Sequence, residues 1–482
     1  MKISACVITK NEEKNIVKWL DCMKEIADEI IVVDTGSKDN TVETAKKYDA
    51  KVYEIKWEND FSAAKNYAID RASGDWIIFL DADEYFTKRS LIHIKKYILE
   101  AMTKKMDGII CKIVNVNEDD NNRILSSFYN LRIFRNHKNL RYKNKIHEMI
   151  SKKGKLNLLQ VINDLEIYHT GYSEHIIKKK LQRNLDLINE EINEFGEKPW
   201  HYGFLADCYY GLKDYENTIK FAQLAIKSGV KLAGQENNVY RRLIDSYLIL
   251  NKDEKIILEI IDIAIKFFPE LPEFIMDKAH VYIMQKKYYE AEVLLNIALD
   301  KHNKKANNIL VNNFEGKLFR LYYYLGEINI IKNETNKAIE YLVEALKLEK
   351  YNSSILIALY SLIKNEENAI IIDFLSAFYY ENSSDMKFLY ATFSKIKNCK
   401  IKFYYRRKLE KYEKDNVDYN IEDDLIAIGN YQEAEKIIKR DLDNIYKLVG
   451  NELYDRLKKE EKDKLIMLLP EKYKMEIYIK HE

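Results

Sequence analysis

The sequence contains few cysteines, and their spacing argues against two common kinds of site. Neighbouring cysteines lie far apart, with no CxxC pair and no spacing typical of metal ligands. Neither a disulfide framework nor a zinc site is therefore expected. The five are Cys6, Cys22, Cys111, Cys208 and Cys399, and we expect reduced, mostly buried thiols.

An excess of one charge and long apolar runs are also missing. Lys and Arg number 78 against 77 Asp and Glu, so no bulk field attracts nucleic acid or an anionic membrane. The opening MKISACVITKNEEK has too few apolar residues for a signal-peptide core. No later stretch has the roughly 18 uncharged residues of a membrane span. We expect a cytoplasmic protein with no integral membrane segment and no nucleic-acid partner.

Residues 2–114 alternate short β-rich runs with amphipathic stretches. This alternation predicts an α/β domain in which helices cover both faces of a parallel sheet. The polar clusters TKNEE, DTGSKDNT and DADE each follow an apolar strand. Because ligands of such sheets bind at the carboxyl ends of the strands, the three clusters should share one rim.

From about residue 172 the strand signals fade and a helical repeat pattern begins. Tyr, Leu and small residues recur at tetratricopeptide (TPR) offsets, where small residues let paired helices approach closely. The three best units contain Tyr202, Leu205, Ala206, Tyr209, Thr218, Ala222 and Ala225; Ala279, Tyr282, Ala291, Leu295 and Ala298; and Tyr322, Leu325, Gly326, Ala338, Leu342 and Ala345. A looser unit is expected at 240–264 and a weak one near Tyr431 and Ala434. The pattern thus supports three or four units, and a plain helical bundle is the alternative.

The chain is long enough for two or more domains. Pro199, the first proline, marks the start of the repeats, and a helix precedes it. We predict a catalytic domain at 1–171, a connecting helix at 172–198 and a TPR-like helical domain at 199–482.

The most specific cluster is Asp81-Ala82-Asp83-Glu84, which ends the apolar run DWIIFL. Two carboxylates at alternate positions can serve one metal ion because the spacer Ala82 points away. Oxygen ligands with open positions suit Mg²⁺ or Mn²⁺ bound jointly with a diphosphate. Taken alone the D-x-D pattern is weak evidence, since most acidic loops at strand ends are merely solvated.

Two further clusters follow the same layout. Asp34 stands at a strand tip, where Gly36 permits a tight turn and Ser37, Asp39 or Asn40 is available to cap the next helix. Asp60 precedes another helix, with Lys65 one turn in. The alternative interpretation of the second cluster is an ordinary N-cap with a solvated lysine.

In this order and spacing, the motifs resemble the GT-A glycosyltransferases of family 2 over roughly residues 3–172. The resemblance implies a Rossmann-like nucleotide-sugar domain that binds a UDP-sugar and a Mn²⁺ or Mg²⁺ ion. The residues implied for the donor are Thr9, Asn11, Glu12, Asp34, Ser37, Asp60, Lys65, Asp81 and Ala82. The metal ligands implied are Asp83, Asp81 and His169.

The downstream segments NLRIFRN, KNKIHEMI and LEIYHTGYS resemble TPR-bearing members of the family, which include peptide S-glycosyltransferases of the sublancin type. This resemblance places His169 in the metal shell and Glu148 at the acceptor side as general base, with His147 supporting or replacing it. The alternative is a structural role for both. In RIFRN, either Arg132 or Arg135 steadies a phosphate, or both are surface cations.

The combined expectation is an inverting glycosyltransferase that moves a sugar onto a Ser or Thr hydroxyl or a Cys thiol of a polypeptide. One alternative acceptor is a cell-surface or lipid-linked saccharide, and another class is a TPR scaffold with a degenerate catalytic domain. A nucleotidyltransferase is disfavoured because ITKNEEK is not a glycine-rich basic loop. The concave surface of stacked repeats suits peptide recognition and also dimer formation.

Overall fold

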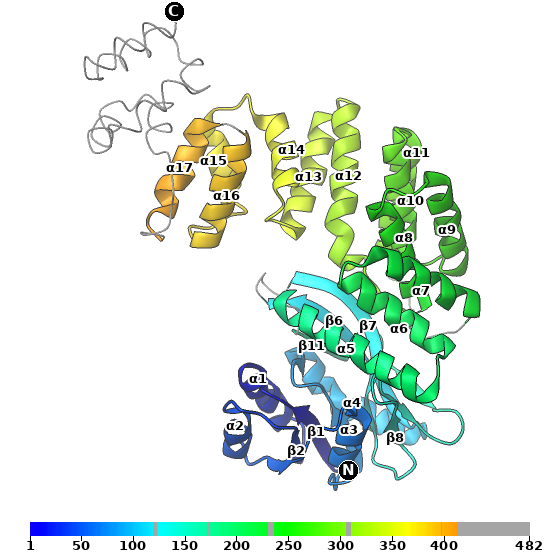
Figure 1. Cartoon of the computed structure of the whole chain (residues 1–482). Coiled ribbons are helices and arrows are strands. Elements are labelled where there is room, and N and C mark those ends of the chain that lie inside the picture. Colours follow the sequence, from blue (N-terminus) through cyan, green and yellow to red (C-terminus); the bar gives the residue numbers. More distant parts are fainter. Residues whose placement is uncertain (119–122, 171–173, 230–235, 305–309, 397, 413–482) are drawn as a thin grey trace, which may run out of the picture. The chain divides into compact units, whose positions relative to one another are not determined.

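A computed structural model describes residues 1–118, 123–170, 174–229, 236–304, 310–396 and 398–412 (Figure 1). The chain divides into two compact units, Met1–Leu318 and Phe319–Glu482. The weak repeat predicted near Tyr431 and Ala434 lies outside the described residues.

The first unit is built on a nine-stranded sheet with the order β3-β2-β1-β4-β7-β6-β11-β5, in which β10 also pairs with β6. Strands β8 and β9 form a separate two-stranded sheet. The strands are β1 Ile3–Thr9, β2 Glu29–Asp34, β3 Lys51–Glu54, β4 Trp76–Phe79, β5 Glu84–Phe86, β6 Gly108–Asn117, β7 Arg123–Arg135, β8 Arg141–Lys143, β9 Met149–Ser151, β10 Leu158–Gln160 and β11 Glu166–His169.

The expected parallel arrangement holds for β3, β2, β1 and β4, and β6 also pairs in parallel with β10 and β11. It is wrong for β7 and β5. β7 runs antiparallel to both β4 and β6, and β5 runs antiparallel to β11. The physical reason is the short connection between β6 and β7, since a parallel pairing would need a crossover of a dozen or more residues.

Helices cover both faces of the sheet, as predicted. Ile3 and Val7 of β1 pack in one core cluster with Trp19 of α1 and Ile94 of α4. Cys6 points the other way, into a cluster with Ala68 of α3, as the period of two in a strand requires. These helices are α1 Glu13–Lys24, α2 Thr41–Lys47, α3 Phe61–Ile69 and α4 Lys88–Thr103.

The first unit continues as helices after β11. They are α5 Glu174–Phe195, α6 Pro199–Gly211, α7 Tyr215–Ser228, α8 Glu236–Ile249, α9 Glu254–Phe267, α10 Pro272–Met284 and α11 Tyr288–Asn303, followed by the 3₁₀ turn η2 Glu315–Lys317. Pro199 opens α6, where its missing N–H has no helical acceptor to satisfy. The repeat alanines Ala206, Ala222, Ala279 and Ala298 are completely buried, so the region has the packing expected of TPR-like pairs. The looser unit at 240–264 falls on α8 and α9.

The second unit contains α12 Leu318–Ile331, α13 Thr335–Leu348, α14 Ser353–Ile363, α15 Asn368–Ser376, α16 Ser383–Ile396 and α17 Cys399–Leu409. Gly326 of α12 lies so close to Leu342 of α13 that an added Cβ would stand 2.7 Å from its Cγ. The small residue therefore sets the approach of the two helices, as the repeat pattern predicts. Among the described residues, α6 to α17 form six helix pairs, more than the sequence pattern supports. The domain limits at 171 and 198 remain predictions.

Two expected absences can be compared with the described part of the chain. The four cysteines whose side chains are described, Cys6, Cys22, Cys111 and Cys208, are buried free thiols. In the same residues, no helix combines the length and apolar character needed to cross a membrane.

Candidate active site

The carboxylates that follow β4 are held by two buried cations. Lys65 Nζ lies 2.9 Å from Asp81 Oδ1, and Arg132 Nη2 lies 3.0 Å from Asp81 Oδ2. Arg132 also contacts Glu84 Oε1 at 2.5 Å. The other oxygen of Glu84 accepts the Asp81 N–H at 3.0 Å. The strand end is thus fixed by a network that crosses from α3 and β7.

The electrostatics of this network favour the charged forms of its two cations. Burial alone would lower the pKa of Lys65, but the carboxylates of Asp81 and Glu148 raise it well above its usual range. Burial likewise opposes the charge of Arg132, whose pKa Glu84 and Asp81 raise. Burial would raise the pKa of Asp81, but Lys65 and Arg132 hold it well below its usual range. The alternative interpretation of Lys65 as a solvated lysine is therefore wrong, since its side chain is only 2% exposed.

Asp83 belongs to a second group, formed with β11 and α5. His169 Nε2 lies 3.4 Å from Asp83 Oδ2, and Lys180 Nζ lies 3.0 Å from the same oxygen. His169 Nδ1 lies 3.0 Å from Asn115 Oδ1. Burial would raise the pKa of Asp83, but His169 and Lys180 lower it well below its usual range.

The two carboxylates of the D-x-D motif therefore have different partners, although Asp83 lies close enough for its charge to raise the pKa of Asp81. Ala82 is buried in the core of the sheet, so the spacer does point away, and any donor contact there would come from its backbone. Asp83 and His169 meet, whereas Asp81 faces Lys65 and Arg132. Within the described residues no three His, Cys, Asp or Glu side chains form a ready ligand set. The assignment of Asp81 to a metal remains a prediction.

Asp34 organises the loop after β2. Its Oδ1 accepts the N–H groups of Gly36 and Ser37 at 2.9 and 2.7 Å. Its Oδ2 accepts the hydroxyls of Thr9 and Ser37 at 2.9 and 2.5 Å. Gly36 has a φ of 104°, which other residues rarely adopt. Three predicted donor residues, Thr9, Asp34 and Ser37, are therefore in direct contact.

The loop after β1 meets this turn. The Asn11 N–H donates to Ser37 Oγ at 2.8 Å, and Asn11 Oδ1 accepts the Lys38 N–H at 2.7 Å. Glu12 is half-buried, and burial raises its pKa. Asp83 raises it further, whereas Lys180 acts in the opposite direction. Glu12 thus connects the loops after β1 and β2 electrostatically with the Asp83 group.

Helix α3 connects the donor side with the segment that carries His147 and Glu148. Asp60 is an ordinary N-cap, because its carboxylate accepts the Ala63 N–H at 2.8 Å. Asn66 exchanges two hydrogen bonds with the backbone of Tyr142 in β8. These bonds fix the position of β8 relative to α3. The chain then runs from β8 to Glu148, the predicted base.

Glu148 and His147 have different surroundings. Glu148 Oε1 lies 2.6 Å from Lys65 Nζ, so one ammonium holds this carboxylate and that of Asp81. His147 has a φ of 53° and stacks on Phe204 of α6, with ring centroids 3.5 Å apart. Burial lowers the pKa of His147 to about 4, so its imidazole is neutral at pH 7.

The sequence left the roles of two cations near the site unassigned: that of Arg132 was undecided, and Lys180 was not recognised. Arg132 was undecided because i and i+3 in a strand do not share a face; a register shift opposite it, between Ile109 and Ile110, interrupts the regular alternation. Lys180 had no signal at all, since α5 reads as a plain amphipathic helix. Arg183, one turn further along α5, lies over the ring of Phe61 at 5.1 Å.

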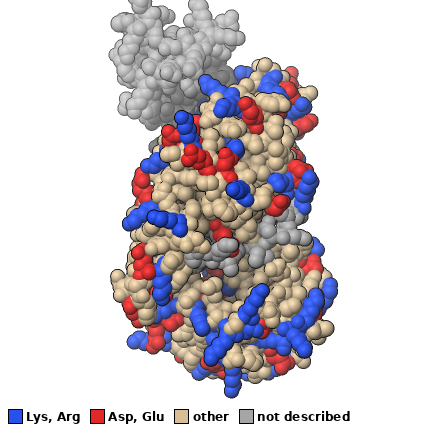
Figure 2. Space-filling view, turned by 90° about the vertical axis from the view of Figure 1, so that its right-hand side faces the viewer, with Lys and Arg blue, Asp and Glu red and all other residues tan. Residues whose placement is uncertain are grey.

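The chain around Glu148 is strongly basic. Between residues 135 and 155, Glu148 is the only acid, and the bases are Arg135, Lys138, Arg141, Lys143, Lys145, Lys152, Lys153 and Lys155. Lys138, Lys143, Lys153 and Lys155 are exposed. Figure 2 shows Lys and Arg gathered on the lower part of the face that β8 borders in Figure 1.

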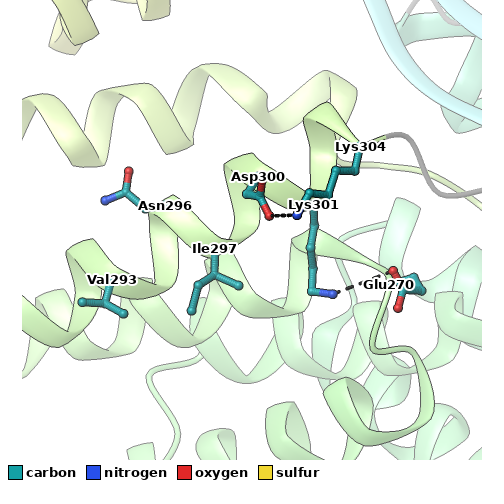
Figure 3. Close-up of a pocket in the computed structure, with 7 residues that line it drawn as sticks. All are labelled: Glu270, Val293, Asn296, Ile297, Asp300, Lys301 and Lys304. Atoms are coloured by element: carbon teal, nitrogen blue, oxygen red, sulfur yellow. Dashed lines mark hydrogen bonds and ion pairs between the residues drawn. The ribbon is translucent and has the colours of Figure 1, made fainter.

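A surface pocket of about 560 Å³ lies elsewhere, along α11 (Figure 3). It is lined by Glu270, Val293, Asn296, Ile297, Asp300, Lys301 and Lys304. It contains none of the predicted site residues, and its ion pairs, Lys301 with Glu270 and Lys304 with Asp300, join its own lining. The predicted site residues therefore lie at the sheet rim and not in this pocket.

Comparison with known families agrees with the geometry of that rim. Residues 4–163 match the model described as glycosyl transferase family 2. The chain carries a family 2 glycosyltransferase domain. This glycosyltransferase is 28% identical over 338 residues to the SPbeta prophage-derived glycosyltransferase SunS of Bacillus subtilis, a match that covers 68% of the chain and 79% of the relative.

Two further similarities concern the helical region and the solved structures. A TPR repeat-containing protein of Synechococcus elongatus is 28% identical to this chain over 267 residues. The match covers 52% of this chain and 62% of that protein. The crystal structure of S. aureus TarS is 18% identical and covers 51% of this chain and 54% of TarS. Its TM-score is 0.29, too low for any inference about this site.

Proposed function

We propose that the enzyme transfers a sugar from a UDP-sugar to a side chain of a peptide or protein, with inversion at the sugar and with a divalent metal ion. The observation that supports this most directly is the double contact of Lys65. Its ammonium binds Asp81 of the donor motif and Glu148, the predicted base, at 2.9 and 2.6 Å. Donor-side and acceptor-side carboxylates therefore meet at one point of the rim.

The nucleoside is assigned to the loops after β1 and β2. The hydroxyls of Thr9 and Ser37 both donate to Asp34 there, and the Asn11 N–H donates to Ser37 Oγ. This internal order presents the loop backbone and the outer side chains in a fixed geometry, which reduces the entropy lost when a ligand binds. Glu12 borders the Asp83 group, on the side assigned to the diphosphate.

The residues around Asp83 suit a divalent ion. Asn115 accepts at His169 Nδ1, which places the proton on that nitrogen and leaves Nε2 facing Asp83. A carboxylate oxygen with an imidazole nitrogen is a donor set that Mn²⁺ accepts, and Mg²⁺ accepts it less readily because it prefers oxygen. An ion held by Asp83 and His169 would offset the charge that develops on the departing diphosphate. Asp81, held by Lys65 and Arg132, is assigned to the donor.

Glu148 is assigned as the general base. A bond forms between the acceptor oxygen or sulfur and C1 of the sugar while the bond from C1 to the diphosphate breaks, and Glu148 takes the acceptor proton. Lys65 fixes the position of this carboxylate. His147, neutral and stacked on Phe204, is assigned to positioning the loop. The helix pairs that follow the sheet in the sequence, and the resemblance to peptide S-glycosyltransferases, support a polypeptide acceptor.

Donor binding is tested by thermal unfolding with UDP, GDP or dTDP and their sugars, with and without Mn²⁺. A ligand at 100 times its Kd adds about 2.7 kcal/mol to the free energy of unfolding. We expect a Mn²⁺-dependent rise in Tm with a uridine nucleotide and its loss in Asp83→Ala. No rise with any nucleotide in the wild type would contradict the proposed donor site.

Acceptor class is tested by mass spectrometry after incubation with the donor identified above. Candidate peptides containing Ser, Thr and Cys are compared with lipid-linked saccharide. We expect transfer onto peptide, with kcat reduced about 10²- to 10⁴-fold in Glu148→Gln and UDP binding retained. Transfer onto the saccharide alone would sink the polypeptide assignment.

A further inference from the structure

Helix α5 sends one cation onto the proposed metal ligand. Lys180 Nζ lies 3.0 Å from Asp83 Oδ2, the oxygen that also faces His169 Nε2 at 3.4 Å. Lys180 lies beyond the family 2 match, which ends at residue 163. The contact therefore connects the helical region with the rim of the sheet.

The Lys180 ammonium and a divalent metal ion cannot both bind Asp83 Oδ2 at the same time. The Asp83 side chain is 11% exposed, and a carboxylate so far removed from water needs a positive partner. Lys180 provides such a partner in the structure, together with His169 when its imidazole is protonated. A divalent ion bound by Asp83 and His169 would take the same position and repel the ammonium.

Lys180 has the freedom to leave. Its side chain is 41% exposed and stands on a flexible four-carbon stem, so it can change rotamer without disturbing α5. The diphosphate of a nucleotide sugar would arrive beside the ion and is a strong acceptor for an ammonium group. When the donor binds and the ion displaces Lys180 from Asp83, the diphosphate can therefore become the new partner of the ammonium.

We propose that Lys180 is the resting counter-cation of Asp83 and yields this place to the divalent ion when the donor diphosphate receives the ammonium. This inference rests on the proposed donor and metal site. Its consequence is coupling: the ion binds weakly to the free enzyme and tightly with the nucleotide. Because coupling is reciprocal, Lys180 also contributes to the nucleotide affinity measured with the ion present.

The test measures the affinity of the full-length protein for Mn²⁺ by electron paramagnetic resonance. The wild type and Lys180→Met are compared with and without UDP. Without UDP, we expect Lys180→Met to bind Mn²⁺ about tenfold more tightly than the wild type. We also expect the gain in Mn²⁺ affinity that UDP produces to be largely lost in the variant. Unchanged Mn²⁺ affinity together with an unchanged UDP effect would overturn the proposal.

Three controls separate this role from others. Lys180→Arg keeps the charge and should keep the coupling, whereas Lys179→Met removes an exposed charge from the same helix and should behave as the wild type. Asp83→Asn should lose Mn²⁺ binding with and without UDP. A wild type that binds neither Mn²⁺ nor UDP would overturn the proposed function together with this inference. Normal binding of both, with wild-type coupling in Lys180→Met, would overturn the role of Lys180 alone.

Discussion

Buried lysine is costly unless its charge is paired, and Lys65 is paired twice. Its ammonium contacts Asp81 and Glu148 and lies over the rings of Phe79 and Tyr142, 5.3 and 5.2 Å from their centroids. Arg132 also pairs with Asp81 at 3.0 Å, whereas Lys65 is the ion-pair partner of Glu148 within the described part of the chain. The residue therefore contributes to stability as well as to the arrangement of the site.

Lys65→Met should lower the free energy of unfolding by about 3 kcal/mol, because it leaves two partly buried carboxylates without their shared cation. Lys46→Met is the matched control. Lys46 pairs with exposed Glu54 at 3.7 Å, and its loss should cost less than about 0.5 kcal/mol. Urea unfolding followed by tryptophan fluorescence measures both. Equal losses in the two variants would show that the buried contacts of Lys65 do not stabilise the domain.

Glu29 should make the stability of the domain depend on acid pH. Burial alone would raise the pKa of Glu29, but Lys51, Ser4 and Ser73 lower it from 4.5 to about 2. The folded pKa lies below the unfolded one, so the contribution is complete above about pH 4.5 and disappears as the pH falls towards 2. Its size is about 3 kcal/mol at neutral pH.

Glu29→Gln should therefore be less stable than the wild type by about 3 kcal/mol at pH 7, and the difference should shrink towards zero as the pH falls through about 2. Urea unfolding at a series of pH values measures this difference. A gap that stays constant from pH 7 to pH 3 would mean that the charge of Glu29 is not what its hydrogen-bonding partners stabilise.

The sequence could predict the site residues that stand at the end of a strand, but not those that reach the site from another element. Asp34, Asp81 and Asp83 follow apolar strands, so their place on the rim could be read from the pattern. The cations that hold them come from elsewhere in the fold. Arg132 and Lys180 reach them across 51 and 97 residues, and such pairings depend on packing that no local pattern records.

At the scale of elements, periodicity predicted the strands and the small residues of the repeats, but not strand direction. β7 enters the sheet antiparallel because its connection to β6 is too short for a crossover. The repeats were recognised where alanine and glycine occupy the contact between paired helices. Pairs such as α14 with α15 were missed because Ile, Leu and Phe pack there, and these residues suit any buried helix.

Gly326→Ala tests the closest of these helix contacts. An added Cβ would stand 2.7 and 2.8 Å from Leu342 Cγ and Cδ2, so α12 and α13 must separate or Leu342 must change rotamer. We expect a loss of about 1 to 3 kcal/mol, measured by hydrogen exchange of α12 and α13. Adding Leu342→Val should restore part of the loss, because the shorter side chain makes room. An additive effect of the two substitutions would argue against a direct steric conflict.

At the scale of the first unit, residues 310–317 link the helices to the sheet. Asn312 and Ser127 of β7 exchange backbone hydrogen bonds of 2.7 and 2.8 Å. Val311 accepts a hydrogen bond from Asn237 of α8 at 2.8 Å, and Lys317 pairs with Asp245 at 3.2 Å. The same short segment is therefore bound to the catalytic sheet and to α8, which places both within one compact unit.

Gly316→Ala should break this link while leaving both of its sides folded. An added Cβ would collide with the backbone carbonyl of Leu125, and a backbone atom cannot yield as a side chain can. We expect faster hydrogen exchange at residues 123–127 and 310–317, with unchanged exchange in β1 and β4, because the contact joins the segment only to the start of β7. UDP binding should stay at the wild-type level, since none of the assigned donor residues contacts the segment. Exchange that rises throughout the sheet would show instead that the segment supports the whole catalytic core, and wild-type exchange at residues 123–127 would show that Gly316 is not needed for the link.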